Sequence, residues 1–157
     1  MGAPMAHTDL LTRECIQLDL QAATREDVFA ALADALALQD ASLRARREEV
    51  LAALRERERL GSTASQKVAI PHVKLPGLAR VSLVLAISKR GVDFRAPDGE
   101  LVHVFFSLVR PVESADRHLA LLRWIAEIAQ HRDFVPFACQ ARTPQEILDL
   151  LAELSPA

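Results

Sequence analysis

The chain has 157 residues and a formal net charge of −2 at pH 7, and half of its residues are hydrophobic. This length suits one folded domain of ordinary size. Nucleic-acid-binding domains usually carry a concentrated basic face, which a net charge near zero does not indicate. We therefore expect a single globular domain over residues 8–155, a flexible tail over residues 1–7, and no nucleic-acid partner.

Neither a membrane segment nor a disulfide pattern is visible in the sequence. No apolar run reaches the roughly 20 residues that a bilayer span needs, and the N-terminus lacks a basic region followed by an apolar one. Cys15 and Cys139 lie far apart and form no C-x-x-C pair. We expect two reduced core thiols, no membrane insertion and a cytoplasmic location.

The first sixty residues predict one strand followed by two helices. Apolar residues alternate with polar ones over 16–20, as in a half-buried strand. Thr24 is a suitable N-cap for a helix with apolar residues at helical spacing over 28–36. A second helix is expected to begin after Asp40 or Ser42 and to end before Gly61.

The middle of the chain predicts three strands. Short apolar or β-branched runs occupy residues 68–70, 81–87 and 101–108, and turn residues separate them. The turn at 96–99 contains a proline and ends in Gly99, which is suited to a positive φ.

Helices return after Pro111. Ser114 is a suitable N-cap for a long helix that ends near His131, and a shorter helical piece is expected over 133–138. The last helix begins with Thr143 as its cap and Pro144 at its first position. Strands between helical blocks predict an α/β fold, with a mixed β-sheet sandwiched between helices on both faces.

Three of the five histidines have ordinary structural interpretations. His7 lies in the expected tail, and His103 alternates with apolar residues along a strand. His131 lies at the C-terminal end of a helix, where a positive charge complements the helix dipole.

His72 and His118 are the candidates for chemistry. His72 follows Pro71 where the chain leaves a short strand, and a neutral imidazole is a good nucleophile toward phosphorus. His118 is expected in the first turn of a helix, where free backbone N–H groups favour an anion. Taken alone, each residue is more often structural than functional. A metal site is disfavoured, because no H-x-x-x-H or H-E-x-x-H spacing accompanies the pair.

Cationic and hydroxyl side chains cluster near His72 in the sequence. Arginine grips phosphate oxygens in a bidentate manner, and serine or threonine donates a hydrogen bond to them. An ordinary helix surface remains the alternative for Arg57 and Arg59, and an ordinary turn for Ser62 and Thr63. The full set is Arg57, Arg59, Ser62, Thr63, Lys67 and Lys74. Walker-type and Gly-x-Gly-x-x-Gly loops are missing from the sequence, so nucleotide binding has no support.

The ordered set of motifs resembles the IIA proteins of the mannitol/fructose and nitrogen-regulatory class of the phosphotransferase system. The resemblance covers most of the chain. It rests on the segments at 57–63, 68–72 and 116–119, on the hairpin at 91–99 and on the closing helix that begins at 143–146.

The resemblance implies a phosphoryl carrier on a mixed sheet covered by helices. His72 is then the residue that accepts a phosphoryl group from an HPr-type phosphocarrier and passes it to a cysteine of a IIB domain. His118 lies beside it, Arg57 holds the phosphate, and Ser62 and Thr63 complete the phosphate-binding set. It implies no cofactor. A regulatory member, which binds a protein target according to its phosphorylation state, is the alternative.

Two departures from the family pattern stand near His72. The family's glycine-rich stretch is replaced by residues 64–67, one residue shorter, and Val73 stands where glycine is frequent. A β-branched residue restricts the backbone where glycine would not. We therefore expect slower phosphoryl acceptance, altered partner choice or loss of phosphotransfer. Lys67 and Lys74 are candidates to offset this by attracting phosphate.

Overall fold

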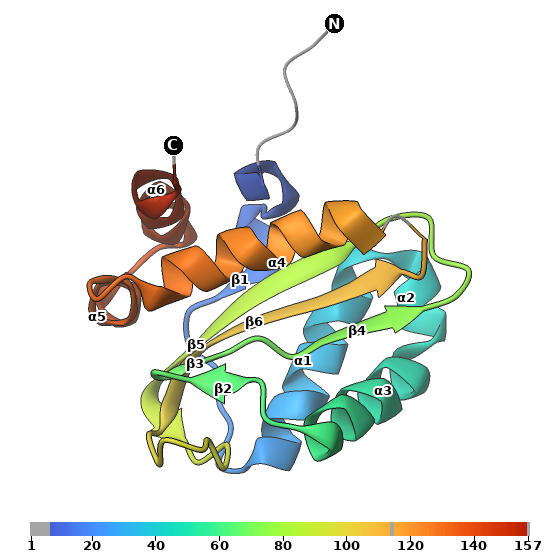
Figure 1. The fold of residues 1–157 in the computed structure, drawn as a ribbon, viewed down its shortest axis with the longest axis horizontal. Coiled ribbons are helices and arrows are strands. Elements are labelled where there is room, and N and C mark those ends of the chain that lie inside the picture. The colour runs from blue at the N-terminus through green and yellow to red at the C-terminus, as the bar shows by residue number, and fades with distance from the viewer. Residues whose placement is uncertain (1–6, 114, 157) are drawn as a thin grey trace, which may run out of the picture.

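The computed structural model describes residues 7–113 and 115–156 (Figure 1). Its elements follow in chain order: η1 (His7–Leu10), η2 (Arg13–Cys15), β1 (Ile16–Gln17), α1 (Arg25–Gln39), α2 (Ala41–Ala45), α3 (Arg47–Leu60), β2 (Ala64–Ser65), β3 (Val68–Ala69), β4 (His72–Leu75), β5 (Ser82–Val92), β6 (Val102–Pro111), α4 (Ala115–Gln130), α5 (Phe134–Gln140) and α6 (Pro144–Leu154).

The strands form one six-stranded mixed sheet with the order β1-β5-β6-β3-β2, and the sixth strand, β4, lies off this path and pairs with β6. β5 pairs antiparallel with one edge of β6, while β3 and β4 pair parallel with its other edge. β1 joins β5 in parallel, and β2 joins β3 in a tight antiparallel hairpin. The mixed sheet expected from the sequence is confirmed.

β3 and β4 are two halves of one line along β6. Their residues keep the same offset to their partners on β6 before and after the break. At the break, the Pro71 carbonyl accepts the backbone N–H of Leu108 at 3.2 Å and the hydroxyl of Ser107 at 2.9 Å. The chain is therefore held against β6 without a change of register, and His72 begins the second half.

Helices cover both faces of the sheet. Neighbouring residues of a strand point to opposite faces. Phe105 packs edge-on against Phe94, which contacts Phe29 of α1, whereas Phe106 stacks on Phe134 of α5. Figure 1 shows α1 to α3 on one side of the molecule and α4 to α6 on the other. The predicted sandwich is confirmed.

The capped helix starts occur where the sequence predicts them. The Thr24 hydroxyl accepts the N–H of Asp27 at 3.1 Å, and the Thr143 hydroxyl accepts the N–H of Glu146 at 3.2 Å. Ser114, the expected cap of the long helix, lies outside the described residues. The expected tail also lies outside them except for His7, which belongs to η1 and contacts the Trp124 ring at 5.4 Å between centroids.

Some predicted element boundaries were wrong. The second helix is divided into α2 and α3 at Arg46, whose φ of −113° and ψ of 22° are not helical. The first strand is only Ile16–Gln17, although Leu20 still bonds to the sheet through Ile87. β5 and β6 run several residues beyond their predicted ends.

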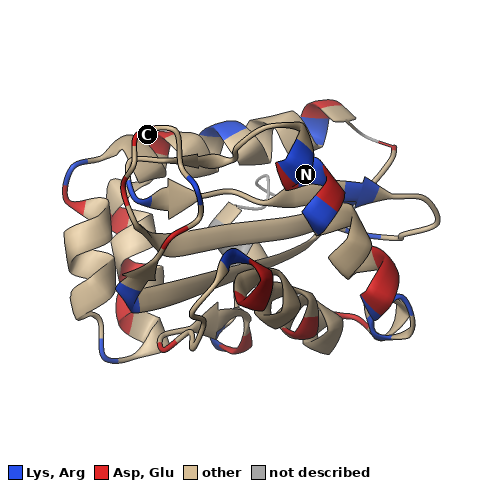
Figure 2. Ribbon diagram, turned by 90° about the horizontal axis from the view of Figure 1, so that it is seen from below, with Lys and Arg blue, Asp and Glu red and all other residues tan. Residues whose placement is uncertain are grey.

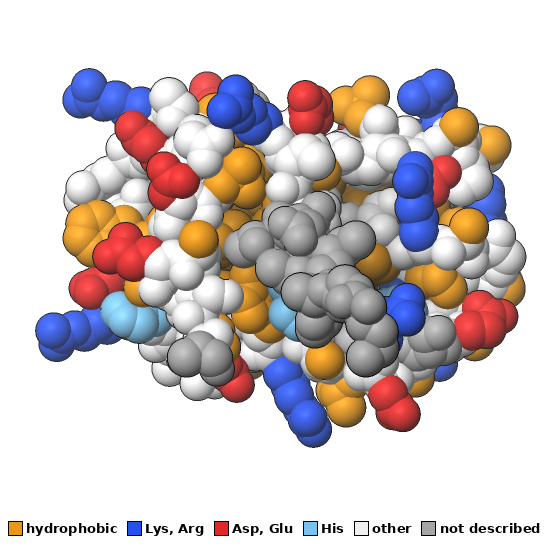
Figure 3. Space-filling model, turned by 90° about the horizontal axis from the view of Figure 1, so that it is seen from above, with side chains coloured by type: hydrophobic (Ala, Val, Ile, Leu, Met, Phe, Trp, Pro, Cys, Tyr) orange, Lys and Arg blue, Asp and Glu red, His pale blue; other side chains and the backbone are white. Residues whose placement is uncertain are grey.

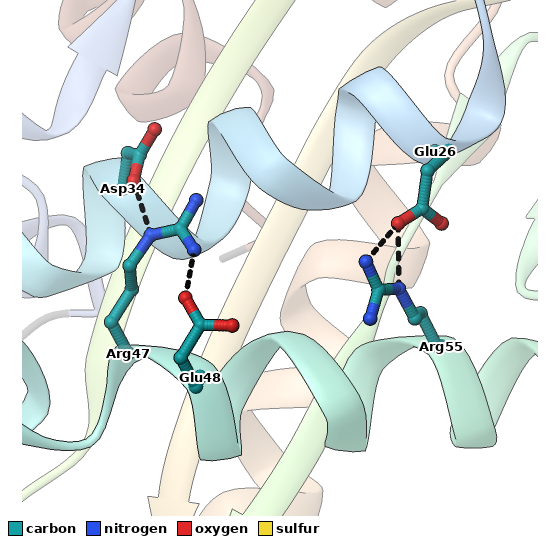
Figure 4. Close-up of polar contacts among 5 residues, drawn as sticks. All are labelled: Glu26, Asp34, Arg47, Glu48 and Arg55. Atoms are coloured by element: carbon teal, nitrogen blue, oxygen red, sulfur yellow. Dashed lines mark hydrogen bonds and ion pairs between the residues drawn. The ribbon is translucent and has the colours of Figure 1, made fainter.

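Ion pairs between α1 and α3 join the helices on one side of the sheet (Figure 4). Arg47 donates to Asp34 at 2.6 Å, and Arg55 pairs with Glu26. Figure 2 shows Lys and Arg positions interspersed with Asp and Glu positions over the same helices. Such exposed pairs contribute little to stability, so the aliphatic and aromatic core holds the layers together.

Both cysteines are free thiols. Cys15 is buried in the core and Cys139 is half-buried against it.

Within residues 7–113 and 115–156, no helix is long and apolar enough to cross a membrane. On the face shown in Figure 3, small groups of hydrophobic side chains lie among charged side chains of both signs.

Candidate functional site

His72 is the first residue of β4, and it follows the stretch of chain that pairs with β2. The hairpin's last bond joins the Ile70 N–H to the Thr63 carbonyl at 3.1 Å. His72 is the partner of Leu108 on β6, and paired residues share a face of the sheet. This is the face on which Phe106 stacks against Phe134 of α5. His72 therefore points toward the layer that contains α4 and α5.

A hydrogen bond fixes the imidazole of His72. Its Nδ1 lies 2.6 Å from the carbonyl oxygen of Ile70. A carbonyl oxygen only accepts hydrogen bonds, so Nδ1 carries the proton and the neutral ring has its lone pair on Nε2. The ring is thereby held with its nucleophilic nitrogen directed away from its own backbone.

The surroundings keep His72 neutral. Burial lowers the pKa of His72 below its usual value, and the positive charges of Arg57 and Arg110 lower it further. The Ile70 carbonyl and Glu58 act in the opposite direction and are outweighed. The uncharged nucleophilic form therefore predominates at neutral pH.

His118 lies in the first turns of α4 and is buried, with 5% of its surface exposed. Burial lowers its pKa, and Arg110 and Arg117 lower it further. Its Nδ1 is buried and has no hydrogen-bond partner among the described residues. Buried polar atoms are normally paired, so this nitrogen is an exception within the described part of the chain.

Arg57 is positioned by the C-terminal end of α3, which lies against β4. Its Nη1 donates to the Gly61 carbonyl at 2.9 Å. Arg57 contributes to lowering the pKa of His72, so its charge acts directly on that ring. The structure thus brings the predicted phosphate-binding arginine to the predicted nucleophile.

Ser62 and Thr63 play different parts in the loop after α3. The Ser62 Oγ accepts the N–H of Ala64 at 3.0 Å, so its own proton remains available to a ligand. Thr63 donates its hydroxyl proton to the buried carboxylate of Glu58 at 2.6 Å, and the Thr63 N–H bonds the same carboxylate at 2.9 Å. Thr63 therefore shapes the loop through Glu58, a residue that the sequence did not single out.

Arg110 is a second residue that sequence reasoning missed. It lies near the end of β6, opposite Lys74 of β4, and on the same face as His72. Its charge contributes to lowering the pKa of both histidines. Only the strand register reveals this proximity, because Arg110 is far from His72 in the sequence and belongs to no motif.

The other cations near His72 in the sequence differ in their surroundings. Arg59 pairs with Glu56 on the surface of α3, and Lys74 is exposed on β4. Lys67 lies in the β2–β3 turn and lines a cleft of about 560 Å³ with His103 and His131. In the described part of the chain, no three His, Cys, Asp or Glu side chains are grouped to hold a metal ion.

Exposed apolar side chains lie close in the chain to the residues of the site. Leu60 precedes the Gly61 loop and is 71% exposed, Val112 follows β6, and Leu119 follows His118 on α4. His72 does not line the cleft that contains Lys67. Exposed apolar side chains of this kind are common at surfaces that contact other proteins.

Val73 does not cover His72. It is buried, it pairs with Val109, and it faces the opposite side of the sheet from its neighbour. The shortened stretch forms the two-residue turn Gln66–Lys67, in which both residues have positive φ. Asp98 accepts the Gln66 N–H at 2.8 Å and so ties this turn to the next hairpin.

The chain is similar to proteins of two functional groups. It is 34% identical over 155 residues to a nitrogen regulatory protein of Bradyrhizobium diazoefficiens, covering 98% of each chain. It is 31% identical over 142 residues to a fructose-specific EIIA component of Haloferax volcanii, covering 90% of this chain and 91% of the other.

A solved structure has the same fold. The nitrogen regulatory protein IIA-Ntr from Neisseria meningitidis superposes with a TM-score of 0.81 and 25% identity, over 92% of this chain and 97% of the other. The family model described as phosphoenolpyruvate-dependent sugar phosphotransferase system, EIIA 2, matches residues 9–154. The chain therefore belongs to the EIIA 2 family of the phosphoenolpyruvate-dependent sugar phosphotransferase system.

Proposed function

We propose that His72 carries a phosphoryl group on Nε2, accepting it from an HPr-type phosphocarrier and passing it to a cysteine of a IIB partner. The observation that carries the proposal is the 2.6 Å contact between His72 Nδ1 and the Ile70 carbonyl. That contact leaves the Nε2 lone pair free and holds the ring in one orientation. It is the arrangement that a histidine nucleophile requires.

The transfer needs only side chains of the two proteins. The Nε2 lone pair attacks phosphorus, the new P–N bond forms, and the bond between phosphorus and the donor breaks with its electron pair returning to the donor. The phosphorylated ring retains the Nδ1 proton, whose hydrogen bond to Ile70 stabilises the developing positive charge. In the second transfer, the partner's thiolate attacks phosphorus and the P–N electron pair returns to His72.

Three neighbouring residues are assigned to the phosphoryl oxygens. Arg57 supplies a positive charge, and Ser62 supplies a hydroxyl proton that is not used within the protein. His118 is assigned to the same group from the first turns of α4. Thr63 acts through the loop, since Glu58 takes its proton. No cofactor is assigned, and the cytoplasmic location stays a prediction.

The direct test is phosphorylation in vitro. The full-length protein is incubated with phosphoenolpyruvate, enzyme I and an HPr-type carrier, and acid-labile phosphate on the protein is measured. We expect label on the wild type and on His103→Gln, a control histidine on the same sheet, and none on His72→Gln. Unlabelled wild type in the presence of a phosphorylated cognate carrier would contradict the proposal.

A regulatory role is the second candidate. It is favoured by the 34% identity to a nitrogen regulatory protein over 98% of both chains. A doubly charged phosphoryl group on His72 would change the charge that the protein presents to a target. The test is binding of candidate protein targets to the unphosphorylated and phosphorylated forms. Equal affinity of both forms for every target bound would argue against the switch.

A further inference from the structure

Arg110 is the charged residue of β6 that lies nearest to the proposed phosphorylation site in the sheet register. His72 pairs with Leu108, and Lys74 pairs with Arg110, so Arg110 is the diagonal neighbour of His72 on the same face. Diagonal neighbours on a sheet are about 7–8 Å apart, within reach of a long side chain. Arg110 therefore lies on the same face of the sheet as His72, at a separation that the length of an arginine side chain can span.

Its guanidinium is tethered at one end. Nη1 donates to the Pro111 carbonyl at 3.0 Å and to the Val112 carbonyl at 3.5 Å. Arg110 is half-buried, and among the described residues no carboxylate forms an ion pair with it. The tether limits the motion of the side chain and leaves its remaining N–H groups and its charge uncompensated.

The carbonyls that hold the Arg110 guanidinium lie in the segment that leads from β6 to the helix carrying His118. Pro111 and Val112 begin the connection from β6 to α4, and α4 carries His118 in its first turns. The charge of Arg110 contributes to the lowered pKa of both His72 and His118. Arg110 is thus the described residue whose charge acts on both rings.

We propose that Arg110 is a second phosphate-binding arginine, which grips the phosphoryl group on His72 from β6 while Arg57 grips it from α3. The inference rests on the proposed function of His72. A phosphoryl group presents several anionic oxygens, and an arginine offers N–H groups in a planar fork that matches them. Its role is to stabilise charge during transfer and to prolong the life of the phosphohistidine.

The test compares Arg110→Gln with Arg142→Gln in the full-length protein. Both changes remove one positive charge, but Arg142 is exposed in the connection between α5 and α6. Three quantities are measured: the rate of phosphoryl acceptance from an HPr-type carrier, the half-life of the phosphohistidine, and the pKa of His72 by NMR. We expect at least about a tenfold slower acceptance for Arg110→Gln, because loss of one preorganised donor commonly costs more than that.

The remaining outcomes separate this inference from the proposed function. The phosphohistidine half-life should also shorten and the pKa of His72 should rise in Arg110→Gln, while Arg142→Gln stays within about twofold of the wild type. If wild type and Arg110→Gln are labelled at equal rates, the role of Arg110 is overturned and that of His72 stands. If the wild type takes no label, both are overturned. Arg110→Met, which keeps the aliphatic stem, replaces the glutamine variant if that variant does not fold.

Discussion

His72 and His118 differ in their burial and in their hydrogen bonds. His72 is half-buried and held by one backbone carbonyl, so a nitrogen remains open to a partner. His118 is buried, and its Nδ1 has no hydrogen-bond partner among the described residues. Both have lowered pKa values, so both rings are predominantly neutral at neutral pH.

The lowered pKa of His72 predicts how phosphoryl acceptance depends on pH. A histidine with an ordinary pKa near 6.5 would lose about half of its nucleophilic form at that pH. Because the pKa of His72 is lower, we expect the acceptance rate to fall only at a more acidic pH. The measurement is the single-turnover rate between pH 7.5 and 5.5 with a separately phosphorylated carrier. A rate–pH profile with its midpoint at or above pH 6.5 would contradict the lowered pKa of His72.

The contact between Thr63 and Glu58 predicts a stability effect. Thr63→Val removes the hydroxyl that donates to the buried Glu58 carboxylate at 2.6 Å. We expect a loss of about 1–3 kcal/mol in the free energy of unfolding, because a buried acceptor loses its partner. Thr63→Ser keeps the hydroxyl and serves as the control. Urea denaturation decides the matter, and equal midpoints for the two variants would disprove the contact's importance.

Among the helices and strands, the sequence correctly predicted the features that depend only on residues close together in the chain. Threonine caps and apolar spacing act within a few residues, so the starts of α1 and α6 were predicted correctly. β4 was missed because Pro71 interrupts the line of β3, and only pairing with β6 identifies the continuation. Arg110 was missed for the same reason, since a strand register depends on contacts distant in the chain.

The β2–β3 turn predicts a stabilising substitution. Lys67 has a φ of 70°, a region that glycine adopts without steric cost. We expect Lys67→Gly to raise the free energy of unfolding by about 1 kcal/mol, because the left-handed conformation penalises a side chain by about that amount. Ser65→Gly, in the extended strand β2, is the matched control and should be destabilising. Thermal denaturation in which both variants lose stability equally would show that the turn is not strained.

At the scale of the molecule, the residues proposed for the site come from segments that are distant in the chain. α3 contributes Arg57, the strand line contributes His72, and α4 contributes His118. The sequence order of these motifs resembles the EIIA family, and that membership is now shown. The placement of Arg57 and Arg110 near His72 could not be obtained from the spacing of motifs alone, because it depends on the packing of α3 against β4 and on the register of β4 with β6.

Both lowered histidine pKa values also predict how global stability varies with pH. Well above pH 6.5, the two rings are neutral in both the folded and the unfolded states, so they leave stability unchanged. As the pH falls below 6.5, the unfolded chain binds protons first, and the free energy of unfolding decreases. Urea midpoints at pH 7.5, 6.5 and 5.5 measure this. The urea midpoint should fall less steeply with decreasing pH in His72→Gln than in the wild type. An equal pH dependence in the two proteins would contradict the lowered pKa of His72.

The central claim is that Nε2 of His72 carries the phosphoryl group. Two-dimensional ¹⁵N–¹H NMR of the histidine rings, recorded before and after phosphorylation by enzyme I and an HPr-type carrier, identifies the modified nitrogen directly. We predict that the Nε2 resonance of His72 shifts on phosphorylation while Nδ1 keeps its proton. Phosphorylation of Nδ1, or of any histidine other than His72, would contradict the account.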